Sequence, residues 1–204
     1  MTRTDLINYI IKKQGYKSYL EIGVQKAERN FNKIDIPYKK SVDPDPKANA
    51  SYCLTSDEYF ESVIRRTSTQ CGMLTGTSER FDVIFIDGLH IADQVRKDII
   101  NSWACLNEGG VLILHDTNPD REEITRVPRE TQEWCGDIYK AIHQIDGPPK
   151  FTLKDDHGVT VIRKTAPLVM SDGIIEWEGF DTFREVILHL VSWEEAIKII
   201  DSWT

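Results

Sequence analysis

The segment after residues 81–86 combines a carboxylate with an imidazole at the end of an apolar run. Asp82 is the only polar residue in that run, and Asp87 and His90 follow it directly. A carboxylate at the end of a buried strand requires a partner, because burying an unpaired charge is costly. An imidazole titrates near neutral pH and can act as a general base. We therefore interpret Asp87 and His90 as candidate catalytic residues.

A second polar pair, His115 and Asp116, follows the apolar run 111–114. With Asp87 they would offer oxygen and nitrogen ligands to a divalent cation. Two carboxylates with water ligands suit Mg²⁺ or Mn²⁺, and an added imidazole favours Mn²⁺ or Zn²⁺. In the alternative interpretation, Asp116 caps the following turn and His115 packs in the core. The residue types leave both interpretations open.

The third candidate is the turn at Gly23, which closes an apolar run and lets the following backbone approach a ligand closely. Asp43 follows about 20 positions later, the spacing at which an acidic residue commonly accepts the ribose hydroxyls of a nucleoside. The full glycine-rich fingerprint is absent. A plain turn with a solvated aspartate therefore remains an alternative.

Apolar patterning predicts the elements that position these side chains. Buried strands are expected at 18–24, 40–43, 81–86 and 111–114, with an antiparallel pair at 151–153 and 159–162. Helices are expected at 4–14, 27–34, 56–66, 91–106, 136–145, 183–190 and 193–200, with Ser56 as an N-cap. A third strand lies at 52–55 or at 71–75, and the pattern does not choose between them.

This order of elements predicts an α/β fold: a Rossmann-like, doubly wound, mostly parallel sheet with an antiparallel edge strand and a helical C-terminal extension. In such sheets ligands bind outside the carboxyl ends of the strands. The candidate residues all follow predicted strands, so we expect them to meet at that edge.

Composition narrows the function classes. The formal net charge of −8 argues against non-specific nucleic-acid binding, which needs a basic face. No apolar run approaches the roughly 18 residues of a membrane span, and the first residues lack a hydrophobic signal core. We therefore expect a cytoplasmic protein. The Trp-containing C-terminal helices would cover either the sheet or a partner subunit, which leaves a homo-oligomer open.

Taken together, the motifs at 19–24, 42–46, 55–60, 81–90 and 111–119 occur in the order seen in class I S-adenosylmethionine-dependent methyltransferases, which this chain resembles. The closer resemblance is to a small bacterial branch similar to sugar and macrolide O-methyltransferases. It covers about residues 15–165. It implies a cofactor-binding domain at 1–165, with residues 166–204 as a helical extension packed on it.

The resemblance also implies roles for individual residues. Glu21, Gly23 and Val24 would line the methionine part of the cofactor, Asp43 would bind the ribose, and Thr55, Ser56 and Asp57 would lie near the adenine. Asp87 would face the reaction centre, His90 would be the base, and Asp87, His115 and Asp116 would hold a metal. His115 stands where metal-dependent relatives carry a carboxylate.

The implied activity is S-adenosylmethionine-dependent O-methylation of a hydroxyl on a small molecule or sugar, with Mg²⁺ or Mn²⁺ as a second cofactor. A nicotinamide-dependent oxidoreductase and a non-catalytic cofactor-binding domain are the alternatives. The loop 118–133 is a candidate lid, on which Arg121, Arg126 and Arg129 either meet an anionic substrate or are solvated. His157 is interpreted as an ordinary turn residue.

Overall fold

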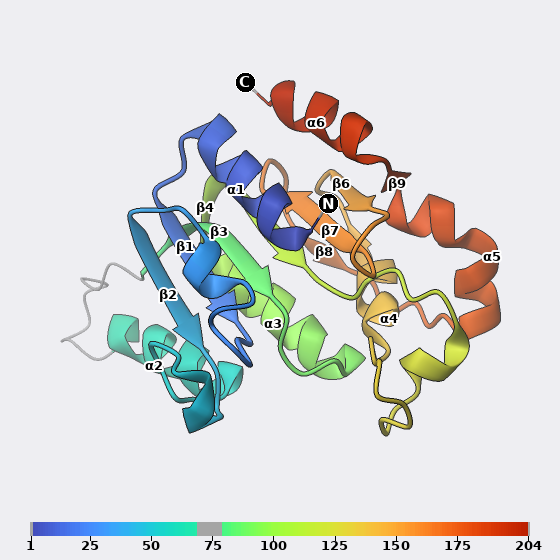
Figure 1. The fold of residues 1–204 in the computed structure, drawn as a ribbon, viewed down its shortest axis with the longest axis horizontal. Coiled ribbons are helices and arrows are strands. Elements are labelled where there is room, and N and C mark those ends of the chain that lie inside the picture. Colours follow the sequence, from blue (N-terminus) through green and yellow to red (C-terminus); the bar gives the residue numbers. More distant parts are fainter. Residues whose placement is uncertain (1, 69–78, 204) are drawn as a thin grey trace.

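The computed structural model describes residues 2–68 and 79–203. A seven-stranded sheet with strand order β2-β1-β3-β4-β7-β6-β9 forms its centre (Figure 1). Its strands are β1 (Ser18–Ile22), β2 (Tyr38–Val42), β3 (Phe81–Ile86), β4 (Leu106–Leu114), β6 (Lys150–Leu153), β7 (Val159–Arg163) and β9 (Leu190–Val191). Strands β5 (Ile145–Asp146) and β8 (Val169–Met170) form a separate two-stranded sheet.

The main sheet is mostly parallel, as predicted. Strands β2, β1, β3 and β4 pair in parallel, and β7 runs antiparallel to both β4 and β6. The antiparallel strand is followed in the sheet by β6 and by the short β9, which pairs in parallel with β6. Strand β9 is only two residues long, so it carries no periodic pattern that the sequence could reveal.

Helices cover both faces of the sheet. They are α1 (Arg3–Gln14), α2 (Ser56–Ser68), α3 (Ala92–Cys105), α4 (Ile138–His143), α5 (Trp177–Leu188) and α6 (Trp193–Asp201). Short 3-10 turns lie at η1 (Phe31–Lys33), η2 (Pro46–Ala48) and η3 (Glu122–Thr125). Along β3, Val83 and Phe85 pack with α1 and α6, whereas Ile84 and Ile86 pack with α2 to α5. Figure 1 shows α1 in front of the sheet and α3 behind it.

The predicted helix at 27–34 is wrong, because only η1 is helical there. The Lys39 Nζ donates to the carbonyl oxygens of Phe31 and Ile34, at 2.9 Å each. The Asn30 amide is drawn instead to Glu21, 2.8 Å away. Lys39 thus takes backbone carbonyls that a continuing helix would use, and the Asn30 contact with Glu21 is made by its side-chain amide.

Helix α2 begins as predicted but is capped one residue earlier. The Thr55 hydroxyl accepts from the Glu58 amide at 3.2 Å, and the Glu58 carboxylate accepts from the Thr55 amide at 2.8 Å. This reciprocal capping box makes Thr55, and not Ser56, the N-cap. The nearby third strand is not formed at 52–55, where Tyr52 makes one isolated bridge to Val42. Residues 71–75 lie outside the described residues.

The C-terminal segment shares the core of the sheet. Phe180 and Leu188 of α5 are buried on one face, and Ala196 and Ile200 of α6 are buried on the other. The division of the chain at residue 165 stays a prediction. Among the described helices, none has the length and apolar character needed to cross a bilayer.

Candidate active site

A cavity of about 760 Å³ lies at the carboxyl ends of β1 to β4. This volume is typical of small-molecule sites. The sheet brings every sequence-predicted site residue to its wall: Glu21, Gly23, Val24, Asp43, Thr55, Ser56, Asp57, Asp87, His90, His115 and Asp116. The predicted convergence of the strand ends is therefore present.

The Gly23 turn packs closely against the end of β3. Gly23 has a φ of +84°, and a Cβ at this position would lie 2.1 Å from the carbonyl oxygen of Asp87. The Asp87 amide donates to the Ile22 carbonyl oxygen at 2.8 Å. Glycine is thus required both for the backbone conformation and for the close approach of the two strand ends.

Asp43, at the end of β2, holds the backbone of the Gly23 turn. Its Oδ2 accepts from the amides of Val24 and Gln25, at 2.8 and 2.9 Å. Its Oδ1 accepts from the Asp45 amide at 2.8 Å. An ionised carboxylate has about four acceptor positions. Asp43 therefore shapes the turn and keeps acceptor capacity at Oδ1 for a ligand hydroxyl.

Glu21 is almost fully buried, with 2% of its surface exposed. Its Oε2 accepts from the Tyr19 hydroxyl at 2.5 Å and from the Asn30 amide at 2.8 Å. Burial raises the pKa of Glu21 to about 7, and these two hydrogen bonds only partly oppose that shift. Tyr19 and Asn30 were not predicted as partners, although Tyr19 lies on the same side of β1 two residues before Glu21.

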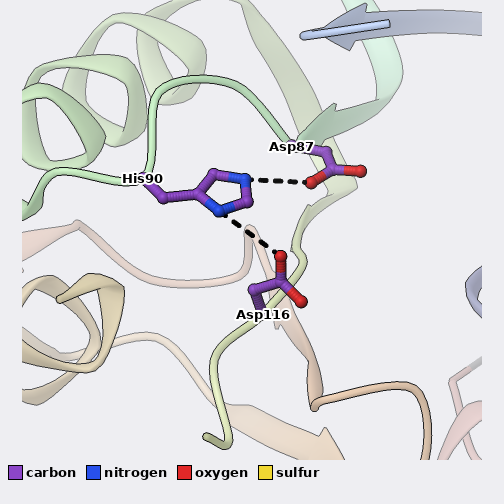
Figure 2. Close-up of side chains that lie close together, drawn as sticks. All are labelled: Asp87, His90 and Asp116. Carbon is purple, nitrogen blue, oxygen red and sulfur yellow. Dashed lines mark ion pairs between the residues drawn. The ribbon is translucent and has the colours of Figure 1, made fainter. Parts of the chain in front are cut away.

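His90 lies between two carboxylates at the ends of β3 and β4 (Figure 2). Its Nε2 is 3.3 Å from Asp87 Oδ1, and its Nδ1 is 3.4 Å from Asp116 Oδ2. The Nδ1 also lies 3.2 Å from the backbone carbonyl oxygen of Trp134. The imidazole stacks on the Trp134 ring at a centroid distance of 5.4 Å. Burial lowers the pKa of His90, but the two carboxylates and the carbonyl raise it above the ordinary value overall.

His115 lies deeper and connects three carboxylates. Its Nδ1 is 3.4 Å from Asp87 Oδ1 and 3.3 Å from Asp116 Oδ1, without a well-aligned hydrogen bond to either. Its Nε2 is 3.4 Å from Asp156 Oδ1. Burial opposes protonation, but these carboxylates raise the pKa of His115 well above its usual value. The side chain is therefore an ion-pair partner and not simply a packed core residue.

Arg3 and Asp156 are site residues that the sequence interpretation missed. The Arg3 amide donates to Asp156 Oδ2 at 2.8 Å, and Arg3 Nη1 is 3.3 Å from Asp156 Oδ1. Arg3 Nη1 also lies 3.2 Å from His115 Nε2, and Arg3 Nη2 lies 3.8 Å from Asp87 Oδ2. The sequence contains no pattern for these contacts, because Arg3 and Asp156 are 153 positions apart.

The rim of the cavity comes from the loop after β4 and from the turn between β6 and β7. Arg129, Trp134 and His157 line it. The Arg129 guanidinium lies 5.7 Å from the centre of the Trp134 ring, on which His90 also stacks. Of the other two loop arginines, Arg121 pairs with acidic neighbours, and Arg126 lies 3.0 Å from Glu130.

The opposite end of the cavity is polar. The Gln94 Nε2 of α3 lies 3.2 Å from Ser56 Oγ, 3.0 Å from Asp57 Oδ1 and 3.1 Å from Asp98 Oδ1. Asp98 is 1% exposed, and burial raises its pKa to about 6. Gln94 and Asp98 line the cavity together with the predicted Ser56 and Asp57. This end can thus offer hydrogen-bond donors and acceptors to a planar heterocycle.

The residues around His90 fit a divalent cation. Within residues 2–68 and 79–203, Asp87, His90 and Asp116 each offer a ligand atom within 4.8 Å of the others. Carboxylate oxygens with one imidazole nitrogen are donors that Mn²⁺ and Mg²⁺ sites use. The predicted ligand His115 contacts the same two carboxylates from the side of Asp156.

Comparisons with known proteins identify the fold around this site. A family model described as a methyltransferase domain matches residues 13–117, which is more than half of the chain. The chain belongs to this methyltransferase family. The matched part of the methyltransferase domain runs from the end of α1 through β4 and ends directly after Asp116. No curated protein matches the chain.

Solved structures show the same fold at low identity. An O-methyltransferase from Bacillus cereus in complex with SAH has a TM-score of 0.51 and 14% identity, over 80% of this chain and 82% of that one. A Staphylococcus aureus protein provisionally assigned as a caffeoyl-CoA O-methyltransferase also has a TM-score of 0.51 and 14% identity, over 79% and 82%. These structures confirm the predicted Rossmann-like fold, and the family model confirms the predicted methyltransferase family.

Proposed function

We propose that this chain transfers the methyl group of S-adenosylmethionine to a hydroxyl of a small molecule, with a sugar as the first acceptor class to test. The observation that carries the proposal is the position of His90. Its imidazole lies between Asp87 and Asp116 on the wall of a cavity that also contains the Gly23 turn. A candidate base therefore lies beside a candidate nucleoside site.

The cavity fits the cofactor in three parts. The Gly23 turn and buried Glu21 lie at one side, where the methionine moiety would bind. Asp43 retains an acceptor position at Oδ1 for a ribose hydroxyl. The polar end around Ser56 and Gln94 would receive the adenine. When bound, S-adenosylmethionine supplies an electrophilic methyl group.

The contact of His90 with Trp134 supports Nε2 as the proton-accepting atom. A carbonyl oxygen can only accept, so a base whose Nδ1 donates to the Trp134 carbonyl has its lone pair on Nε2. The Nε2 atom then receives the proton of the acceptor hydroxyl. Asp87, 3.3 Å from that nitrogen, stabilises the imidazolium formed. Stacking on Trp134 keeps the ring in this orientation.

Asp87 and Asp116 would hold Mg²⁺ or Mn²⁺ if the enzyme uses a metal. When bound, a divalent cation lowers the pKa of an acceptor hydroxyl. His115 also contacts both carboxylates, so it would be the imidazole ligand of such a cation. Under this proposal His90 keeps its role as base.

Calorimetry with S-adenosylhomocysteine and with NAD is the first test, because it separates a methyltransferase from an oxidoreductase. We expect binding of S-adenosylhomocysteine and none of NAD; tight binding of NAD alone would overturn the proposal. Transfer of labelled methyl groups to a panel of sugars and other hydroxyl compounds, with and without Mn²⁺, is the second test. Cofactor binding without turnover across the panel would favour a non-catalytic binding domain.

A further inference from the structure

We propose that Arg3 is a built-in cation of the reaction centre, which holds Asp87 and Asp156 together and weakens the binding of a divalent cation at Asp87. The inference rests on the proposed function in taking Asp87 and Asp116 as cation ligands. It adds Arg3, a residue of the N-terminal helix that precedes the matched family segment of residues 13–117.

Asp156 fixes the position of Arg3. Its carboxylate accepts from the Arg3 backbone amide at 2.8 Å and lies 3.3 and 3.4 Å from Arg3 Nη1. Arg3 is the first residue of α1, and the positive end of a helix dipole favours a carboxylate there. The backbone and the side chain of one residue therefore bind the same carboxylate. This double contact leaves the guanidinium little freedom to turn away from the cavity.

The fixed guanidinium reaches the end of β3. Arg3 Nη2 lies 3.8 Å from Asp87 Oδ2, whereas His90 and His115 approach Asp87 Oδ1. The two oxygens of Asp87 thus have different partners. Arg3 lines the cavity and is only one-fifth exposed at its side chain, so water screens its charge weakly.

A permanent charge at this position opposes a dication on the same carboxylate. An arginine side chain carries a positive charge in proteins. It repels a metal ion at Asp87 and also engages the oxygen that a bidentate ligand would need. Removal of the charge should therefore increase the affinity for a dication, whereas the loss of a purely structural contact would not.

The test measures Mn²⁺ binding to the full chain by electron paramagnetic resonance, with no activity assay. Arg3→Met and Arg3→Gln both remove the charge, and the glutamine variant keeps a donor for Asp156. We expect about a tenfold or greater gain in Mn²⁺ affinity in each neutral variant. The gain should be smaller in Arg3→Lys, because lysine keeps the positive charge but lacks the planar guanidinium. Unchanged or weaker Mn²⁺ binding in both neutral variants, relative to the wild type, would overturn the inference.

Arg29→Met is the matched control. Arg29 lines the same cavity, but its guanidinium donates to the Gln25 side chain and not to the aspartates. A gain in Mn²⁺ affinity equal to that of the Arg3 variants would show a general charge effect and overturn the specific role. Thermal unfolding confirms that each variant is folded.

Binding of S-adenosylhomocysteine is measured separately. Failure of the wild type to bind it would overturn the proposed function and not the effect of Arg3 on Mn²⁺.

Discussion

The Nδ1 atom of His90 lies 3.2 Å from the backbone carbonyl oxygen of Trp134, while the two rings stack at 5.4 Å. One residue of the rim loop thus orients the candidate base through its main chain and its side chain together. Gly136 completes this contact: a Cβ there would lie 1.8 Å from the His90 carbonyl oxygen. The loop after β4 therefore helps to shape the candidate active site.

Replacement of His90 by alanine should lower methyl transfer by about 10²- to 10⁴-fold, the usual contribution of a general base. Affinity for S-adenosylhomocysteine should change little, because Asp43 and the Gly23 turn remain. Rate measurements check the loss of methyl transfer, and calorimetry checks the affinity for S-adenosylhomocysteine. His157→Ala is the control, since His157 lines the cavity but contacts Glu133 on the rim. Full activity of His90→Ala would remove His90 as the base.

Asp43→Ala should weaken cofactor binding by about ten- to a hundredfold, because a hydrogen bond to a charged group contributes about 1.5–3 kcal/mol. The variant also releases the amides of Val24 and Gln25, which shape the turn. Asp45→Ala is a matched control, because the Asp45 side chain accepts from the Lys47 amide outside the turn. Calorimetry with S-adenosylhomocysteine measures the effect, and equal affinities for the two variants would contradict the ribose role.

Gly23→Ala should destabilise the protein by about 2–5 kcal/mol, because it adds a clash with the Asp87 carbonyl to the strain of a positive φ. Gly109→Ala separates the two causes. Gly109 has a φ of +76° but nothing within 4 Å of a built Cβ, so only about 1–2 kcal/mol is expected. Urea unfolding measures both free energies. Similar losses in the two variants would show that the clash is relieved at low cost.

Glu21 should make the free energy of unfolding depend on pH between about 4.5 and 7. Its folded-state pKa of about 7 lies above the ordinary 4.5, so the folded state binds the proton more tightly than the unfolded state. Its contribution is full below pH 4.5 and is lost as the pH rises through 7. The loss is on the order of 3 kcal/mol. Urea titrations of Glu21→Gln at several pH values should lack this pH-dependent loss of unfolding free energy. Parallel pH profiles for the wild type and the variant would contradict the assigned role of Glu21.

Much of the site could be predicted because it lies at the ends of strands. The apolar run at 81–86 matches β3 residue for residue, and the expected turn at Gly23 follows β1 directly. In a parallel sheet, adjacent strand ends meet at one edge, so finding the strands was enough to bring Asp43, Asp87 and Asp116 together.

Local pattern was insufficient where tertiary partners compete with it. Residues 27–34 have helical spacing, yet Lys39 and Glu21 take the polar groups of that segment. Strand β9 lies between α5 and α6 in the chain, and the packing of these two helices places it beside β6. A strand of two residues is too short to show a periodic pattern in the sequence.

By itself, then, the sequence determined the parallel strands β1 to β4, the antiparallel pair β6 and β7, and the polar residues that follow β1 to β4. Only the tertiary structure decided which partners those residues have: Arg3 from α1, Asp156 from the turn between β6 and β7, and Trp134 from the rim loop. The reason is physical. Strand ends converge through a regular, local pattern, whereas polar contacts between positions more than 100 residues apart depend on how whole elements pack.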